Sequence, residues 1–261
     1  MGGQKRIILW CIPRTCSTAF ARSIVTLKKV QYLNEKYFKP FYVGEERKSK
    51  RYDDVSDTFS ECFTYKETKE IYEEEYPDFE IIFAKEMAMY LGDLVDKWEN
   101  IPSGYRHTFI IREPSITVPS LYKCLTDKER NGTDYFDPME ASFEPIHQLF
   151  HLVKEQQGST PVIINTKDLL DNPEAVMKQY CEKTGLEYSP KMLHWDAGPV
   201  EGTTWHKYPG WHGELVKSNG FKTADQLEDV INLDEMPTEV HECIKENQTY
   251  YDELKKYCLK I

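Results

Sequence analysis

The residues best suited to chemistry lie at positions 13–18 (Pro-Arg-Thr-Cys-Ser-Thr), directly after the apolar run 7–12. The apolar run predicts a buried strand, and residues 17–27 predict a helix with small and hydroxyl side chains in its first turn. Unpaired N–H groups at a helix start attract an anion, and the helix dipole favours it further. Arg14 adds a guanidinium whose planar fork of donors suits phosphate or sulfate oxygens. The segment therefore predicts an anion cradle between a strand and a helix.

A second basic residue follows another short apolar run. Arg112 comes directly after residues 108–111, and Pro114 suits the first position of a new helix, where its missing N–H costs nothing. Ser120 lies eight residues after Arg112, about two turns into this helix. Pro119 is unusual inside a helix and predicts a kink or a break there. The ends of both predicted strands thus carry an arginine.

These two segments resemble those of a known family. The common Gly-x-x-x-x-Gly-Lys-[Ser/Thr] nucleotide loop is absent, because no glycine lies between Gly3 and Gly44. Residues 13–18 instead resemble the 5′-phosphosulfate loop, Pro-[Lys/Arg]-Ser-Gly-[Ser/Thr]-Thr, of sulfotransferases that use 3′-phosphoadenosine 5′-phosphosulfate (PAPS). Cys16 stands where that family usually has glycine, so the backbone there must accept a residue with a Cβ. Arg112 and Ser120 resemble the family's 3′-phosphate segment in residue type and spacing.

The resemblance implies a PAPS-binding P-loop-like sulfotransferase fold, in which PAPS leaves as adenosine 3′,5′-bisphosphate. It assigns the 5′-phosphate to residues of the first loop: Arg14, Thr15, Cys16, Ser17 and Thr18. It assigns the 3′-phosphate to Arg112 and Ser120. A looser likeness in residues 211–221 adds Lys217, Ser218 and Gly220 as contacts of that phosphate.

Sulfonyl transfer resembles phosphoryl transfer, in which the protein supplies position and countercharge around an in-line displacement. We assign Arg14 and Lys85, which ends the predicted strand 80–85, to the charge that develops on the transferring group. No metal is expected, because side chains supply the positive charge. The acceptor must lose a proton, so a general base is also expected.

The base is where the sequence departs from the family. Many small-molecule sulfotransferases have Lys-Thr-His at the strand end that matches Lys85, whereas this chain has Lys-Glu-Met. Glu86 and His206 are our catalytic candidates. Three further histidines compete with them: His107, His194 and His212. Glu86 has the alternative interpretation of an acid placed at a helix N-terminus, where the dipole favours it.

The aromatic clusters at residues 37–42 and 203–208 are suited to shaping an acceptor pocket or a lid. We therefore expect a small, fairly apolar acceptor with a hydroxyl group, such as a phenol or an enol. Two other functions remain open: an ATP-dependent small-molecule kinase, and a nucleotide-binding protein without catalysis. The missing Gly-Lys-[Ser/Thr] signature counts against the kinase.

The elements that must position these residues alternate between strand and helix, which predicts a single α/β domain over residues 1–261. We expect a mostly parallel central sheet with helices on both faces. The predicted strands are 6–12, 30–33, 80–85, 107–112 and 161–166. The predicted helices are 17–27, 55–76, 88–98, 114–126, 143–156, 173–184 and 237–257. Ligands of such sheets bind beyond the carboxyl ends of the strands, where Arg14, Lys85 and Arg112 all fall.

Composition limits the partners. The formal net charge of −11 disfavours non-specific nucleic-acid binding, so an anion site must be a local basic pocket. No apolar stretch reaches the length of a membrane span, and the first residues lack a signal-peptide core, so we expect no membrane partner. Seven scattered cysteines without a Cys-x-x-Cys pair predict reduced thiols in a cytoplasmic protein.

Overall fold

Five parallel strands form the centre of the protein, in the order β2-β3-β1-β4-β5. The computed structural model describes residues 3–53, 63–223 and 232–261. The strands are β1 (Lys5–Cys11), β2 (Val30–Asn34), β3 (Ile81–Met87), β4 (Arg106–Ile111) and β5 (Val162–Asn165). Continuous apolar runs form these strands because both faces of a parallel sheet are covered. The prediction of a single α/β fold with a mostly parallel sheet is confirmed.

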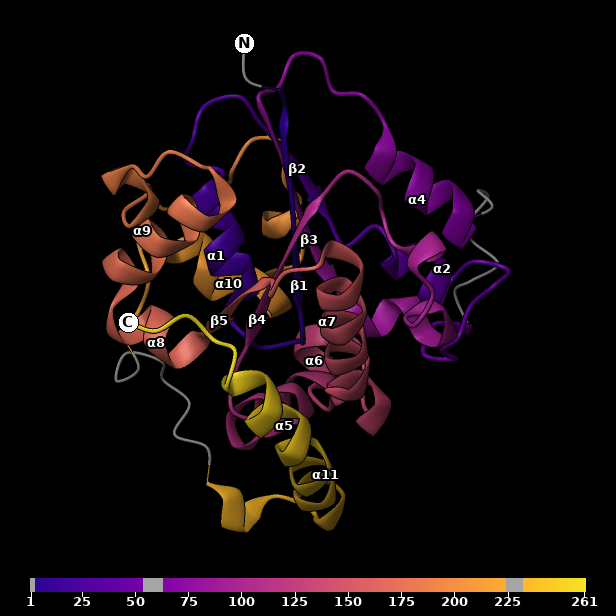
Figure 1. Ribbon diagram of the computed structural model, residues 1–261. Helices are drawn as coiled ribbons and strands as arrows, with labels where there is room; N and C mark the ends of the chain where they lie inside the picture. The colour runs from indigo at the N-terminus through magenta and orange to yellow at the C-terminus, as the bar shows by residue number, and fades with distance from the viewer. Residues whose placement is uncertain (1–2, 54–62, 224–231) are drawn as a thin grey trace.

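Helices cover both faces of the sheet. The α-helices are α1 (Ser17–Ile24), α2 (Phe38–Tyr42), α4 (Tyr65–Glu73), α5 (Pro114–Leu125), α6 (Lys128–Asn131), α7 (Glu144–Gln157), α8 (Thr166–Asp171), α9 (Pro173–Thr184), α10 (Pro209–Lys217) and α11 (Thr238–Lys255). Figure 1 shows α1, α9 and α10 on one face, with α4 and α7 on the other. Short 3₁₀ helices connect them: η1 (Ala88–Leu94), η2 (Trp98–Asn100), η3 (Pro138–Ala141), η4 (Pro190–Met192), η5 (Trp205–Lys207) and η7 (Leu233–Glu235).

The register of the sheet brings the predicted strand ends together. Cys11 at the end of β1 lies opposite Met87 of β3 and Ile110 of β4. Parallel neighbours end at the same edge of a sheet, so the residues that follow β1, β3 and β4 lie along one edge. The buried side chains of β1 and of its two neighbours hold this edge in the core of the molecule.

Three predictions about helices need correction. The helix predicted over 88–98 is wrong, because Gly92 (φ 57°, ψ −131°) interrupts the helical backbone and only 3₁₀ turns form on either side. Pro119 does not break α5, whose buried side chains pack on both sides of it. The helix predicted over 55–76 begins at Tyr65, after a capping box between Thr64 and Glu67, and residues 55–62 lie outside the described residues.

The C-terminal helix α11 was predicted correctly. It packs against α5 and α7, as Figure 1 shows. A second, smaller apolar core between α5 and α11 contains Val118, Leu121, Val240 and Cys243. None of the helices in the described ranges combines the length and the apolar composition that crossing a bilayer requires.

Candidate functional site

The loop between β1 and α1 is held in an unusual backbone conformation. Arg14 (φ 68°) and Cys16 (φ 58°) both lie in the left-handed region, which side chains with a Cβ rarely adopt. Thr15 between them is fully buried, and its hydroxyl donates to the carbonyl of Ile12 over 2.8 Å. The Thr166 hydroxyl donates to the carbonyl of Thr15, also over 2.8 Å. Thr15 therefore holds the loop from its buried side, and its hydroxyl is occupied by a hydrogen bond within the protein.

This loop presents the start of α1 without a cap. The first amide of the helix with a backbone partner is that of Phe20, which donates to Cys16. Cys16 gives no side-chain cap, and the first turn carries no acidic residue. The amides of Ser17 and Thr18 are therefore available to an anion, and the helix dipole adds positive potential there. Ser17 itself is buried.

The two predicted anion segments meet at this point. The Arg14 Nε donates to the Ser120 hydroxyl over 3.0 Å, although 106 residues separate them. Arg112 Nη1 donates to the Arg14 carbonyl over 3.2 Å and lies 4.0 Å from the Cys16 sulfur. Two guanidinium groups, a hydroxyl and uncapped helix amides thus surround one place at the edge of the sheet.

Lys85 brings a third cation to the same edge from β3. Its ammonium is 1% exposed and pairs with the carboxylate of Glu35, directly after β2. Burial alone lowers the pKa of Lys85, but the Glu35 carboxylate outweighs this effect and raises the pKa overall. Lys85 is therefore charged at neutral pH. Glu35 also lies 3.4 Å from the Tyr90 hydroxyl and has a left-handed backbone (φ 44°).

Sequence reasoning missed Glu35. A signal was present, because Glu35 lies two residues after the predicted strand 30–33, and the rule that found Lys85 and Arg112 at strand ends extends to it. In the register of the sheet, Asn34 of β2 lies opposite Lys85 of β3, so Glu35 is adjacent to the lysine.

His212 of α10 is the histidine that lies among these charges. The pKa of His212 is lowered to about 4: burial is the largest cause, the positive charges of Lys85 and Arg14 act in the same direction, and the Glu35 carboxylate partly opposes them. The imidazole is therefore neutral at pH 7. Among the histidines that the sequence left open, His212 is the one whose pKa is lowered by the charges of both Lys85 and Arg14.

The structure does not bring Glu86 to the site. Successive side chains of a strand point to opposite faces, so Glu86 lies across the sheet from Lys85. Its carboxylate accepts hydrogen bonds from the Tyr72 hydroxyl (2.5 Å) and from the amides of Tyr37 (2.9 Å) and Met87 (2.8 Å). Burial raises the pKa of Glu86 to about 8 in spite of these three donors.

The other histidine candidates also lie elsewhere. His206 is exposed on η5. His107 is buried in β4, where its Nδ1 accepts from the Trp10 indole over 2.9 Å and burial lowers its pKa to about 3. His194 forms an isolated bridge with Gly220.

The late segment with Lys217, Ser218 and Gly220 packs at the far end of α1. The Ser218 hydroxyl donates to the Leu215 carbonyl (2.7 Å) and accepts from the Trp195 indole (3.1 Å). The Lys217 ammonium is exposed and lies 3.7 Å from Glu214. In the described part of the chain, no hydrogen bond joins this segment to Arg112 or Ser120.

Aromatic side chains adjoin the Glu35–Lys85 pair. Tyr90 packs with Phe38 and Tyr42 at ring-centroid distances of 5.9 and 5.6 Å. Trp205 of η5 lies 5.3 Å from Tyr32 of β2. Both aromatic clusters that the sequence suggested for an acceptor pocket thus contribute rings on this side of the molecule.

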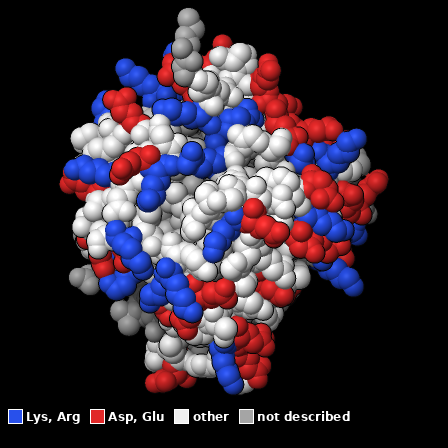
Figure 2. Space-filling view, in the orientation of Figure 1, with Lys and Arg blue, Asp and Glu red and all other residues white. Residues whose placement is uncertain are grey.

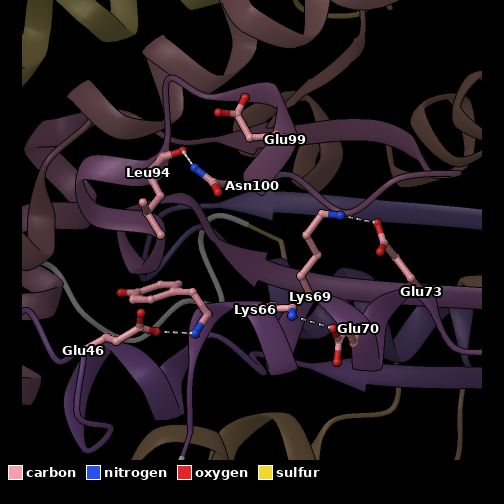
Figure 3. A pocket seen from close by; sticks show the side chains of 9 residues that line it. Glu46, Lys66, Lys69, Glu70, Glu73, Leu94, Glu99 and Asn100 are labelled. Carbon is pink, nitrogen blue, oxygen red and sulfur yellow. Dashed lines mark hydrogen bonds and ion pairs between the residues drawn. The ribbon is translucent and has the colours of Figure 1, made fainter.

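The pocket in Figure 3 contains none of these residues. It lies between α4 and the 3₁₀ segments η1 and η2, and its lysines pair with its own glutamates. Lys69 lies 2.8 Å from Glu73, and Lys66 lies 3.9 Å from Glu70. Figure 2 shows basic and acidic side chains mixed over one face, with acidic ones gathered where α4 lies in Figure 1. The unpaired backbone amides and the clustered cations make the edge of the sheet the candidate functional site instead.

Comparison with known proteins gives a family match over most of the chain. Residues 5–240 match the family described as the sulfotransferase domain. Over 226 residues, 83% of this chain, the sequence is 25% identical to branched-chain-amino-acid aminotransferase-like protein 2 of Arabidopsis thaliana. It covers 36% of that protein, so the chain spans about a third of this relative's length. Over 102 residues, 34% of this chain and 30% of the relative, it is 28% identical to sulfotransferase ppzF of Metarhizium rileyi.

Solved structures show the same fold. The sulfotransferase domain of the Synechococcus PCC 7002 olefin synthase has a TM-score of 0.53 at 10% identity, covering 94% of this chain and 95% of that one. The sulfotransferase domain of the curacin biosynthetic pathway has a TM-score of 0.50 at 13% identity, covering 94% and 98%. Mouse sulfotransferase SULT7A1, complexed with PAP, has a TM-score of 0.50 at 11% identity, covering 98% and 89%.

Proposed function

Since this chain belongs to the sulfotransferase family, we propose that it moves the sulfonyl group of PAPS to a hydroxyl of a small, fairly apolar acceptor. The observation that carries the proposal is the meeting of Arg14, Arg112 and Ser120 at the uncapped start of α1. A nucleotide with phosphates at both its 3′ and 5′ positions needs two anion sites close together, and this arrangement offers them. The PAP in the complex of the mouse neighbour is a nucleotide of this kind.

Each phosphate has its own donors in the proposal. The amides of Ser17 and Thr18 and the Arg14 guanidinium hold the 5′-phosphate, because uncapped helix amides and a planar fork of donors suit its oxygens. Arg112 and Ser120 hold the 3′-phosphate. Thr15 and Cys16 act through the backbone, by keeping the loop in its left-handed conformation.

The reaction is an in-line displacement at sulfur. The bond from the acceptor oxygen to sulfur forms, the bond from sulfur to the phosphate oxygen breaks, and adenosine 3′,5′-bisphosphate leaves. Arg14 and Lys85 stabilise the negative charge that develops on the bridging oxygen and on the transferring group. Glu35 orients the Lys85 ammonium.

His212 takes the proton of the acceptor hydroxyl as general base. The base must be unprotonated before the reaction, and the low pKa of His212 ensures this at neutral pH. The family's Lys-Thr-His strand end carries its histidine two residues after the lysine, a position that Met87 occupies here. In this chain α10 supplies an imidazole to the same face of the sheet.

The acceptor side is aromatic. Phe38, Tyr42 and Tyr90 pack together next to Glu35, and Trp205 with Tyr32 lies near the same carboxylate. Aromatic rings favour flat, apolar ligands. A phenol or an enol of small size therefore suits the acceptor position.

A thermal-shift experiment separates this function from the kinase and from a generic nucleotide binder. We expect adenosine 3′,5′-bisphosphate to raise the melting temperature, because a ligand of the folded state stabilises it, and ATP with Mg²⁺ to give no comparable shift. Arg112→Ala should lose most of the shift, whereas the control Arg130→Ala, on exposed α6, should keep it. Equal shifts with ATP and Mg²⁺ would identify a kinase instead.

Turnover completes the test. Transfer of labelled sulfonyl from PAPS to an acceptor library should occur with the native chain and disappear in Arg14→Ala, with the folded state intact by circular dichroism. Bisphosphate binding without any transfer would indicate a non-catalytic binder.

A further inference from the structure

Two histidines and one glutamate face one another between α7 and α11, on the opposite side of the sheet from α1 and α10. His147 and His151 lie one helical turn apart on α7, and Glu253 lies on α11. His147 Nε2 is 2.9 Å from one Glu253 oxygen, and His151 Nε2 is 3.0 Å from the other. These are the one group of three potential metal ligands found in residues 3–53, 63–223 and 232–261, with all three donor atoms within 4.8 Å of one another.

We propose that His147, His151 and Glu253 bind a divalent transition-metal ion, Zn²⁺ in the first place, which joins α11 to α7. This site is independent of the sulfonyl-transfer site and does not rest on the proposed function. We expected no metal from the sequence, but the spacing of four residues between the two histidines places both imidazoles on one face of a helix.

The surrounding side chains hold the three ligands in place. Tyr250 packs against the His147 ring at 5.2 Å, and Phe150 packs against the His151 ring at 5.3 Å. The rings of His147 and His151 are 4.5 Å apart. Asn247, one and a half turns before Glu253, accepts from the Phe143 amide over 2.8 Å and fixes the register of α11 against α7. Packing and hydrogen bonds of the surrounding residues thus fix the positions of the three ligands.

The donor set selects the kind of ion. Two imidazole nitrogens and one carboxylate suit Zn²⁺ and its transition-metal neighbours, whereas Mg²⁺ and Ca²⁺ prefer oxygen ligands alone. A tetrahedral Zn²⁺ with bonds of about 2.0–2.1 Å keeps its ligand atoms about 3.3 Å apart. The two contacts to Glu253, which go to different carboxylate oxygens, need to open by a few tenths of an ångström, and donor atoms up to 4.8 Å apart need to close toward about 3.3 Å. Three protein ligands leave the fourth position to water.

A metal here would brace the helix that supports the edge of the sheet. Gln248 of α11 donates to Glu113 over 3.1 Å, and Glu113 is the residue next to Arg112. Tyr251 accepts from Asn165 at the end of β5 over 3.2 Å. Both contacts come from the α11 turns just before Glu253. We therefore assign the site a structural role: it holds α11 against α7.

Zinc binding by the chain, stripped with a chelator and dialysed at pH 7.5, tests the proposal. Calorimetry should give one Zn²⁺ per chain with a micromolar or tighter dissociation constant, and Mg²⁺ should not compete. Co²⁺ should give the visible absorption of a four-coordinate site without a thiolate charge-transfer band, which separates this site from the cysteines. Zn²⁺ should also raise the melting temperature.

Variants locate the ion. His147→Gln and His151→Gln should each weaken zinc binding by at least about 100-fold and abolish the zinc-dependent rise in melting temperature. The matched control His241→Gln, on the exposed face of α11, should bind zinc like the native chain. The proposal is overturned if the native chain binds no zinc at micromolar concentration. It is equally overturned if the double variant of His147 and His151 binds zinc as well as the native chain.

Discussion

Lys85 and Glu86 are neighbours in β3, yet they belong to two different regions of the molecule. Lys85 faces α1 and α10. It pairs with Glu35, and its charge, like that of Arg14, lowers the pKa of the neutral His212. Glu86 faces α4, where a tyrosine hydroxyl and two backbone amides occupy its carboxylate. Both side chains are almost completely buried. A buried ionisable residue is therefore not by itself a sign of catalysis.

The regions differ in how their polar groups are satisfied. Around Glu86 the donors come from fixed backbone and a packed tyrosine, so nothing is left for a ligand. Around Lys85 the helix amides of α1 are uncapped, and three of the four non-glycine residues with positive φ in the described chain lie there: Arg14, Cys16 and Glu35. Strained backbone and unpaired donors persist where the surrounding fold fixes them, often at ligand sites. This contrast supports the proposal that the Lys85 face is the catalytic one.

The strongest test of the contrast removes the cation. Lys85→Met should reduce turnover about 10³-fold, because it deletes a charge that acts on the transition state. Bisphosphate affinity should change little, since Arg14, Arg112 and the amides of α1 hold the nucleotide. Single-turnover rates and calorimetry measure the two quantities separately.

Lys85→Met also leaves the Glu35 carboxylate without its partner, which destabilises the fold. The double variant Lys85→Met, Glu35→Gln removes this complication and should be equally inactive. Native turnover in a folded Lys85→Met variant would remove Lys85 from the mechanism.

His212→Gln should reduce turnover about 10²-fold, with bisphosphate binding retained, because a glutamine amide accepts no proton. The pH profile gives a sharper test. A base works only when unprotonated, so activity falls as the pH drops through its pKa. Because the pKa of His212 is lowered to about 4, kcat/KM of the native chain should stay level down to about pH 5.

An acid limb in kcat/KM near pH 6.5 would contradict the assignment of His212 as the base. His206→Gln serves as the matched control for His212→Gln and should leave the profile unchanged.

Glu86 should affect stability and not rate. The folded protein holds its proton up to about pH 8, whereas an unfolded chain releases it near 4.5. The stabilising contribution is therefore complete below pH 4.5 and is lost as the pH rises toward 8, with a slope of at most about 1.4 kcal/mol per pH unit. Glu86→Gln should flatten this part of the stability profile in urea titrations. A loss of turnover as large as that of His212→Gln would restore Glu86 as the base.

The sequence alone predicted the parts of the site that depend on strand ends and local spacing. Apolar runs predicted all five strands, and the resemblance to sulfotransferases singled out the loops that carry Arg14 and Arg112. His212 remained one of several histidines, because its approach to Lys85 depends on how α10 packs over the sheet. Glu86 was a candidate base because it is next to Lys85 in the sequence, but strand alternation turns its side chain to the opposite face of the sheet. The kink at Gly92 arises from a positive φ that composition does not reveal.

The smallest expected effect concerns Cys16, where the family usually has glycine. In the left-handed conformation a Cβ costs roughly 1–2 kcal/mol, and glycine removes that cost. Glycine also gains more freedom in the unfolded chain, which offsets roughly 0.5–1 kcal/mol of the gain. Cys16→Gly should therefore stabilise the chain by less than about 1 kcal/mol in urea unfolding and keep bisphosphate affinity within a few fold. A large loss of affinity would mean that the sulfur near Arg112 takes part in binding, and that the loop needs the side chain as well as its backbone shape.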